Sequence, residues 1–297
     1  MKVPDETTIP GRRVVSKPTD DEIDVYGVTH PGRVRPTNQD HFLIGSLRKR
    51  MNVLMTSLPE IDRLPADSER LAFLAMVADG VGGQAGGEEA SRRALETVTQ
   101  YLTNSMHCYY TADASDDRTF AQALADAALQ THEEITSRAK SDPVRNRMAT
   151  TLTLLLGVWP RIYILQVGDS RSYVLRNGRL MQISRDQTMA QELVDQGVLS
   201  RAEASGTRWA HVLSSAIGGP QTRPVVTGVE SGWGDVHLLC SDGLTKHVSD
   251  ERIAERLGAM TSAKQACEAL LQDALDGGGT DNITVIVGRA VRSRAPA

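Results

Sequence analysis

The chain of 297 residues is long enough for one large domain or two ordinary ones, and its 40% hydrophobic and 24% charged residues are typical of a soluble globular protein. Its net charge of −4 gives no excess of basic residues to neutralise a phosphate backbone, so we expect no nucleic-acid partner. No apolar run reaches the roughly 20 residues that cross a bilayer, and the N-terminus lacks the apolar stretch of a signal peptide. We therefore expect no membrane partner and a cytoplasmic location.

The three cysteines, Cys108, Cys240 and Cys267, are far apart and form no CxxC pair. This spacing indicates neither a zinc site nor a disulfide framework. We expect three free, buried thiols in a reducing compartment.

The polar residues 1–22 contain three prolines and predict a flexible N-terminal lead, and residues 291–297 predict a short tail. Between them no linker and no internal repeat divides the chain. We therefore expect one domain over residues 23–290.

The first part of this domain predicts short strands over 24–29 and 41–44. The apolar segment 71–78 reads as a strand that ends at the turn signal Asp79-Gly80. Residues 46–70 are polar and contain two prolines, so we expect a long excursion there and no core element.

The rest of the chain combines helical and strand periodicity. Apolar residues at helical spacing predict helices over 88–102 and 119–140, and strict alternation from Leu152 to Val158 predicts a strand. Asn177-Gly178 predicts a hairpin turn. The remaining expectations are strands over 161–166, 171–175, 180–183, 236–240 and 283–287, and helices over 188–196 and 262–274. Runs of strands with helix pairs favour an α+β fold, in which helices cover two sheets packed face to face.

Four aspartates lie where predicted strands begin or end: Asp40, Asp79, Asp242 and Asp281. If they converge, their mutual repulsion requires a cation. Carboxylate oxygens are hard ligands that suit Mg²⁺ or Mn²⁺. Each aspartate alone is at least as well explained as a turn residue, because Asp-Gly is a common turn dipeptide. A turn role for all four requires four independent coincidences.

Glycines surround Asp79, in the order Asp79-Gly80-Val81-Gly82-Gly83, and allow a close approach of the backbone. No Lys-Ser/Thr follows and no GxGxxG is present here, so neither a Walker A loop nor a dinucleotide site is indicated. Arg35 lies near Asp40 and can clamp a phosphate through two hydrogen bonds, whereas a lone surface arginine is the simpler explanation.

Six motifs follow one another along the chain: Gly32-x-x-Arg35-x-x-Asn38-Gln39-Asp40, VADGVGG at 77–83, MATTL at 148–152, GDSR at 168–171, LLCSDGLT at 238–245 and GTDNITV at 279–285. Together they resemble the metal-dependent Ser/Thr protein phosphatases of the protein phosphatase 2C type, in their bacterial branch, over about residues 24–289. The resemblance implies a four-layer α-β-β-α sandwich with two central antiparallel sheets. It also implies two Mn²⁺ or Mg²⁺ ions and hydrolysis of phosphoserine and phosphothreonine by metal-activated water.

By position, the resemblance implies that Asp79 bridges the metals and that the Gly80 carbonyl binds one of them. Asp242 and Asp281 are implied to hold one metal, and Asp40 to act on the other side, partly through water. Arg35 is implied to bind the substrate phosphate. We expect Asp169, in the GDSR motif, to be structural and hydrogen-bonded in a tight turn.

Some positions depart from the family pattern. Gln39 replaces a frequent Glu, and Val81 replaces the His of many eukaryotic members, which leaves the general acid unassigned. His41 and His211 are candidates for the general acid by residue type alone, although packing roles fit them better. A third metal is left open, because Asp142 and Asn146 do not match the expected spacing. Residues 190–211 correspond to the family's mobile flap.

Three functions are compatible with these features: an active phosphoprotein phosphatase, a non-catalytic binding module on the same fold, and a hydrolase of small phosphate esters or nucleotides. Retention of all four aspartates and Arg35 favours the first. The expected partners are phosphorylated proteins, the substrates of a Ser/Thr kinase in signal transduction, and the chain is expected to be a monomer. The choice between Mn²⁺ and Mg²⁺ stays open, because both accept the same carboxylates.

Overall fold

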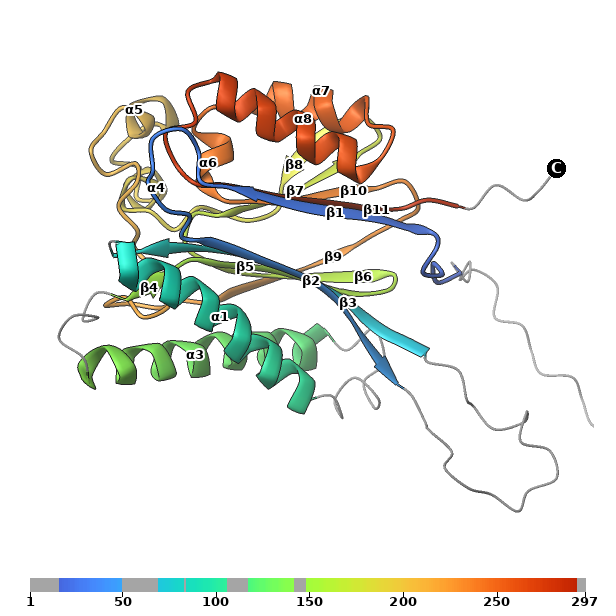
Figure 1. Cartoon of the computed structure of the whole chain (residues 1–297), viewed down its shortest axis with the longest axis horizontal. Helices are drawn as coiled ribbons and strands as arrows, with labels where there is room; N and C mark the ends of the chain where they lie inside the picture. The colour runs from blue at the N-terminus through green and yellow to red at the C-terminus, as the bar shows by residue number, and fades with distance from the viewer. Residues whose placement is uncertain (1–15, 50–68, 83, 106–116, 142–147, 293–297) are drawn as a thin grey trace, which may run out of the picture.

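The computed structural model describes residues 16–49, 69–82, 84–105, 117–141 and 148–292. Two antiparallel sheets lie face to face, and helices cover the outer face of each sheet (Figure 1). The predicted α+β class and the four-layer α-β-β-α sandwich are confirmed.

One sheet has five strands in the order β1-β11-β10-β7-β8, with bounds β1 Ile23–His30, β11 Ile283–Ala290, β10 Val236–Cys240, β7 Arg171–Arg176 and β8 Arg179–Gln182. The other sheet has six strands in the order β2-β3-β5-β6-β9, with β4 paired to β3; the bounds are β2 Asp40–Lys49, β3 Glu69–Val81, β4 Ala149–Thr150, β5 Leu152–Val158, β6 Arg161–Val167 and β9 Val225–Glu230.

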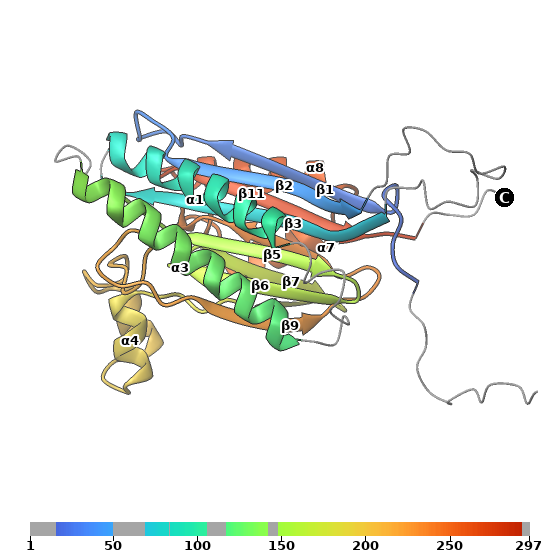
Figure 2. The same cartoon turned by 90° about the horizontal axis from the view of Figure 1, so that it is seen from below.

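Helices α1 (Gln84–Asn104) and α3 (Asp117–Ser141) lie side by side across the six-stranded sheet (Figure 2). Helices α7 (Asp250–Gly258) and α8 (Ala263–Asp276) cover the five-stranded sheet. Three short helices gather at one end of the sandwich, on the left in Figure 1: α4 Met189–Asp195, α5 Arg201–Ser205 and α6 Asp242–Thr245. Within the described ranges, no helix combines the length and apolarity that a membrane crossing requires.

Alternation along the strands builds three apolar layers. Leu154 and Leu156 of β5 pack beneath α1 and α3, whereas Leu155 faces the other sheet. In the same way, Val285 of β11 packs beneath α8 and Ile286 faces the space between the sheets. Full burial of such a side chain contributes about 1.5–3 kcal/mol. The central strands are therefore buried on both faces, and the ends of the sandwich are left for chemistry.

Several local predictions are confirmed. Asn177 and Gly178 have φ angles of 51° and 76°, the left-handed values of a two-residue hairpin turn between β7 and β8. Helix α4 begins after Thr188, whose side chain accepts a hydrogen bond from the Gln191 N–H. Cys240 and Cys267 are free and buried, whereas Cys108 lies outside the described residues.

The strand bounds near the first turn signal were predicted wrongly. Strand β3 continues through Asp79 to Val81, because Thr150 and Ala149 of β4 pair with Gly80 and Val81. The excursion predicted over 46–70 is wrong at both ends, because β2 extends to Lys49 and β3 begins at Glu69. Residues 50–68 lie outside the described ranges. Strand β9 and helices α5, α6 and α7 were not predicted.

The residues before β1 contact the sandwich. The Lys17 ammonium donates to the Arg70 carbonyl, and the Arg70 guanidinium donates to the Pro18 carbonyl and, at 2.6 Å, to the Asp20 carboxylate. The predicted lead of residues 1–22 is thus bound to β3 where it is described, and residues 1–15 and 293–297 lie outside that part of the chain.

Candidate metal centre

Asp40 and Asp79 are register partners in the antiparallel pair of β2 and β3. Directly opposite residues project from the same face of a sheet, so the two carboxylates are neighbours. Asp40 is only 3% exposed, and its Oδ2 accepts a 2.7 Å hydrogen bond from the Thr284 hydroxyl of β11. This bond connects the two sheets at the end of the sandwich where Asp79 lies.

Asp242 and Asp281 come to the same end from the five-stranded sheet. Asp242 follows β10 as the first residue of α6, and Asp281 lies two residues before β11, the neighbouring strand. The Ser241 N–H donates to the Thr284 carbonyl at 3.1 Å and holds the two strand ends together. The Lys246 ammonium joins the two carboxylates, at 2.6 Å from Asp242 Oδ2 and 2.7 Å from Asp281 Oδ2.

These residues share a cavity of about 900 Å³. Its lining includes three of the four predicted aspartates, Gly80 and three basic side chains: Asp79, Asp242, Asp281, Gly80, Arg35, Arg223 and Lys246. Asp40 lies behind Asp79, buried. The structure thus brings together every residue that the sequence assigned to the site.

Arg35 reaches the site from the loop between β1 and β2. Its Nε and Nη2 donate to the two oxygens of Asp281 at 2.7 and 3.0 Å. The Arg35 side chain is 53% exposed, and the residue lines the cavity. A guanidinium carries five N–H donors, so donors remain for a ligand in the cavity.

Asn282 positions this loop, a role that the sequence did not reveal. Its Nδ2 donates to the Pro31 and Thr37 carbonyls at 3.0 and 2.9 Å, and its Oδ1 accepts the Gln39 N–H at 2.8 Å. Three bonds from one buried side chain therefore fix the backbone on both sides of Arg35. Its place directly after Asp281 in GTDNITV was the only signal that could have found it.

The backbone of Asp79 is held by Thr151. The Thr151 hydroxyl accepts the Asp79 N–H at 3.0 Å, and the Thr151 N–H donates to the Asp79 carbonyl at 2.9 Å. The same hydroxyl lies 2.8 Å from the Ser170 hydroxyl, which connects the MATTL and GDSR motifs. Gly80 must be glycine, because a Cβ there would lie 2.3 Å from the Gly87 carbonyl oxygen.

Burial and mutual repulsion raise the pKa values of the inner carboxyl groups. Desolvation is the largest cause for Asp79, whose pKa lies well above its ordinary value, and the charge of Asp40 adds to it. Burial also raises the pKa of Asp40 to about 6 and that of Asp169 to about 8. In both cases the charge of Asp242 is a further cause. The inner part of the site therefore requires positive charge at neutral pH.

At the outer part of the site, neighbouring cations lower the pKa of a carboxyl group. Burial favours a higher pKa for Asp281, but hydrogen bonds from Arg35 and Lys246 outweigh it and lower the pKa. The Asp281 hydrogen bond raises the pKa of Arg35. Burial opposes the charge of Lys246, yet Asp242 and Asp281 hold the pKa of its ammonium above the ordinary value.

Two carboxylate oxygens fit a metal ligand set. Asp40 Oδ1 and Asp242 Oδ1 are buried and have no hydrogen-bond partner in the part of the chain that the structure describes. Such oxygens are costly unless a cation or a water meets them. Across the same described residues, no three Asp, Glu, His or Cys side chains form a ready-made metal cage. The donor set is therefore one of separated hard oxygens, which suits an ion that keeps several waters.

The other residues considered from the sequence lie beside the site, away from it or outside the described residues. His41 lies 3.0 Å from the Ser91 hydroxyl through Nδ1, and burial lowers its pKa, so it packs beside α1. His211 and Asp169 both line the cavity, which places Asp169 beside the site. The proposed flap, 190–211, contains α4 and α5. Asp142 and Asn146 lie outside the described residues.

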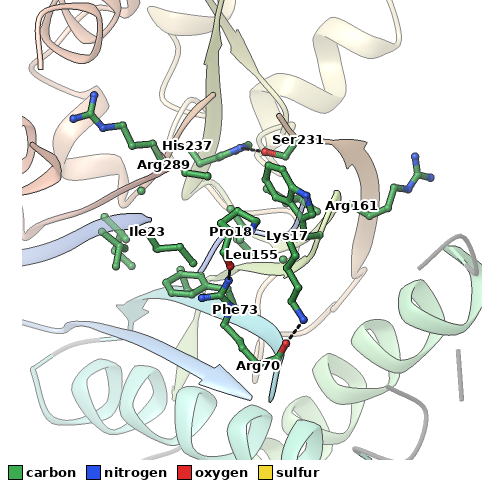
Figure 3. Close-up of a pocket in the computed structure, with 18 of the residues that line it drawn as sticks. Lys17, Pro18, Ile23, Arg70, Phe73, Leu155, Arg161, Ser231, His237 and Arg289 are labelled. Carbon is green, nitrogen blue, oxygen red and sulfur yellow. Dashed lines mark hydrogen bonds between the residues drawn. The ribbon is translucent and has the colours of Figure 1, made fainter. Parts of the chain in front are cut away.

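A second cavity, of about 100 Å³, lies between the two sheets at the opposite ends of the strands (Figure 3). Phe73, Leu155 and Ile23 line it, and the Ser231 hydroxyl lies 2.9 Å from His237 Nε2 at its wall (Figure 3). Its lining contains no carboxylate among the described residues. This cavity therefore offers no carboxylate ligand for a metal ion.

Comparison with known proteins finds relatives that are phosphatases. Residues 55–277 match the family model described as Protein phosphatase 2C. The chain is 38% identical over 223 residues to the serine/threonine protein phosphatase PstP of Mycobacterium tuberculosis, a match that spans 74% of this chain and 41% of that protein. It is 30% identical over 215 residues to the serine/threonine phosphatase stp of Listeria monocytogenes, spanning 72% of this chain and 83% of that protein.

Solved structures agree with the sandwich. The M. tuberculosis phosphatase PstP/Ppp has a TM-score of 0.72 at 30% identity, over 91% of this chain and 99% of that chain. The catalytic domain of PstP in complex with two manganese ions has a TM-score of 0.69 at 31% identity, with the same coverage. The match of the chain to PstP spans less than half of that relative's full length.

Proposed function

Because the chain belongs to the protein phosphatase 2C family, we propose that it hydrolyses phosphoserine and phosphothreonine in proteins at a centre of two Mn²⁺ or Mg²⁺ ions. One observation carries this proposal: four aspartates from two sheets and Arg35 meet at one end of the sandwich, where two buried carboxylate oxygens have no hydrogen-bond partner among the described residues. The complex of PstP with two manganese ions supports the number and kind of ions.

In this proposal, Asp79 and the Gly80 carbonyl hold the ions from β3, and Asp242 and Asp281 hold one ion from the other sheet. Asp40 acts from behind Asp79, partly through water. Bound divalent ions lower the pKa of water and neutralise phosphate charge. Because Thr151 fixes the Asp79 backbone, the central carboxylate stays aimed at the cavity.

Arg35 binds the phosphoryl group of the substrate. The Asp281 carboxylate holds Nε and Nη2, so the guanidinium plane is oriented before the substrate enters. Its remaining N–H donors bind phosphoryl oxygens, on which negative charge develops in the transition state. Water attacks phosphorus in line with the serine or threonine oxygen, which leaves as the hydroxyl. No protein nucleophile is required.

We place the substrates among proteins phosphorylated by a Ser/Thr kinase, and the enzyme in the cytoplasm as a monomer with one domain over residues 23–290. The similarity to Ser/Thr phosphatases supports phosphorylated proteins as the substrates.

The test is phosphate release from a phosphothreonine peptide, with nucleotides and a small aryl phosphate as competing substrates, in Mn²⁺ and in EDTA. The proposal predicts metal-dependent release with the peptide preferred. A preference for nucleotides or small esters identifies a small-molecule hydrolase. Binding of the peptide without turnover in Mn²⁺ identifies a binding module.

A further inference from the structure

The site contains a cation that belongs to the chain itself. The Lys246 ammonium lies 2.6 Å from Asp242 Oδ2 and 2.7 Å from Asp281 Oδ2, and its side chain is 22% exposed. Asp242 and Lys246 are four residues apart, so one turn of α6 brings them together. The first residue of this short helix is thus a proposed metal ligand, and the residue that caps its C-terminus supplies a counter-charge for that ligand.

Three of the four carboxylate oxygens of Asp242 and Asp281 contact a basic side chain. Both Oδ2 atoms are engaged by Lys246, and Asp281 Oδ1 accepts from Arg35. Asp242 Oδ1 is buried and without a hydrogen-bond partner in the described part of the chain. A divalent ion bound by this pair must therefore lie close to the positive charge or displace the ammonium.

We propose that Lys246 is a built-in counter-ion of the metal centre, which holds Asp242 and Asp281 together without metal and weakens their affinity for a divalent ion. This inference rests on the proposed function, because it takes both aspartates as metal ligands. Lys246 acts through these carboxylates, so it is a positioning residue. Like charges a few Å apart in a partly buried site repel strongly, and the ion therefore competes with the ammonium.

Two effects of opposite sign follow for Lys246→Met. In EDTA the variant has a lower Tm than the wild type, because the two carboxylates lose the cation between them. In Mn²⁺ the variant binds the ion more tightly, by roughly ten-fold, since the competing charge is absent. The Tm deficit therefore shrinks or reverses as Mn²⁺ is added. A lysine with only a structural role lowers the Tm in both conditions and leaves the affinity unchanged.

The experiment measures Mn²⁺ binding by isothermal titration calorimetry and Tm in EDTA and in Mn²⁺. Lys246→Gln, which keeps a hydrogen-bond donor but removes the charge, is measured beside Lys246→Met as the better-folded neutral variant. Lys264→Met on α8 is the matched control, because the Lys264 side chain is 62% exposed and its ammonium pairs with Glu268 away from the site. The control is expected to bind Mn²⁺ as the wild type does.

Tighter Mn²⁺ binding in both neutral variants, with a Tm deficit confined to EDTA, supports the proposal. Unchanged or weaker Mn²⁺ binding in Lys246→Gln overturns it, while metal-dependent turnover by the wild type leaves the proposed function intact. A wild type that binds no Mn²⁺ overturns both.

Discussion

Asp40 and Asp79 lie directly opposite each other in β2 and β3, in register, and a hydrogen bond from Thr284 of the other sheet holds Asp40 there. Burial is the main cause of the raised pKa values of both carboxyl groups, and neighbouring negative charges add to it: Asp40 acts on Asp79, and Asp242 and Asp281 act on Asp40. The fold keeps the pair in spite of this repulsion, as expected where a bound cation offsets it.

The raised pKa values make the metal-free protein less stable as the pH rises toward 8, the opposite of the usual effect of aspartates in a folded protein. Folded Asp40 has a pKa of about 6, whereas the unfolded side chain has one of about 4, so the folded state binds the proton more tightly. The resulting stability is complete below about pH 4 and is lost as the pH rises through about 6, and Asp169 extends the loss toward about 8. Buried His237, whose pKa is lowered to about 4, opposes part of this loss between pH 5 and about 6.5. We expect the Tm in EDTA to fall by roughly 5 °C between pH 5 and pH 8.

Saturating Mn²⁺ is expected to flatten this profile, because the ion stabilises the ionised carboxylates. Asp40→Asn removes one of the titrating groups and is expected to reduce the slope in EDTA. Thermal unfolding followed by circular dichroism over this pH range measures both effects. A Tm in EDTA that rises from pH 5 to pH 8 contradicts the account of the pair.

Arg35 is expected to determine substrate affinity. Hydrogen bonds to charged groups contribute about 1.5–3 kcal/mol, so Arg35→Ala should raise the KM for a phosphothreonine peptide roughly 10- to 100-fold. Arg35→Lys keeps the charge without the fork of donors and should recover only part of the loss. Arg33→Ala is the matched control, because Arg33 is exposed and contacts Asp276 at 3.4 Å. Equal effects at both arginines would argue against a specific phosphate contact.

Asn282 is expected to act on substrate binding through the Arg35 loop. Asn282→Ala removes three hydrogen bonds to the backbone of this loop and should lower the free energy of unfolding by about 1–3 kcal/mol. It should also raise the KM for the phosphopeptide, since Arg35 loses its fixed position. Asn282→Asp keeps the acceptor for the Gln39 N–H but turns a carboxylate oxygen toward the Pro31 and Thr37 carbonyls, so it should be at least as destabilising as Asn282→Ala. A lower Tm with an unchanged KM would restrict Asn282 to a structural role.

The positions of the four aspartates could be predicted because each follows or precedes a strongly patterned strand. The segment before Asp79 is continuously apolar, and strand β10 before Asp242 is completely buried. Strand β9, in contrast, has the edge position in its sheet and a mixed exposure, so its sequence VVTGVE lacks a clear period. Edge strands of this kind are determined by their partner, here β6, more than by their own pattern.

The charge relationships could not be predicted for a different reason. Lys246 and Asp242 form an i,i+4 pair only because residues 242–245 are helical, and no helix was predicted there. The contact of Lys246 with Asp281 depends on two distant segments that the β10-β11 pairing brings together. Such contacts follow from tertiary structure, which propensity and periodicity do not encode.

The central claim is most directly tested by phosphate release from a phosphothreonine peptide by the wild type and by Asp242→Ala, each in saturating Mn²⁺ and in EDTA. Asp276→Ala is the matched control, because this carboxylate is exposed and lies outside the site. The account predicts release by the wild type and by the control only in Mn²⁺, with a loss of roughly 100-fold or more in Asp242→Ala. Wild-type release that persists in EDTA, or full activity of Asp242→Ala, would contradict it.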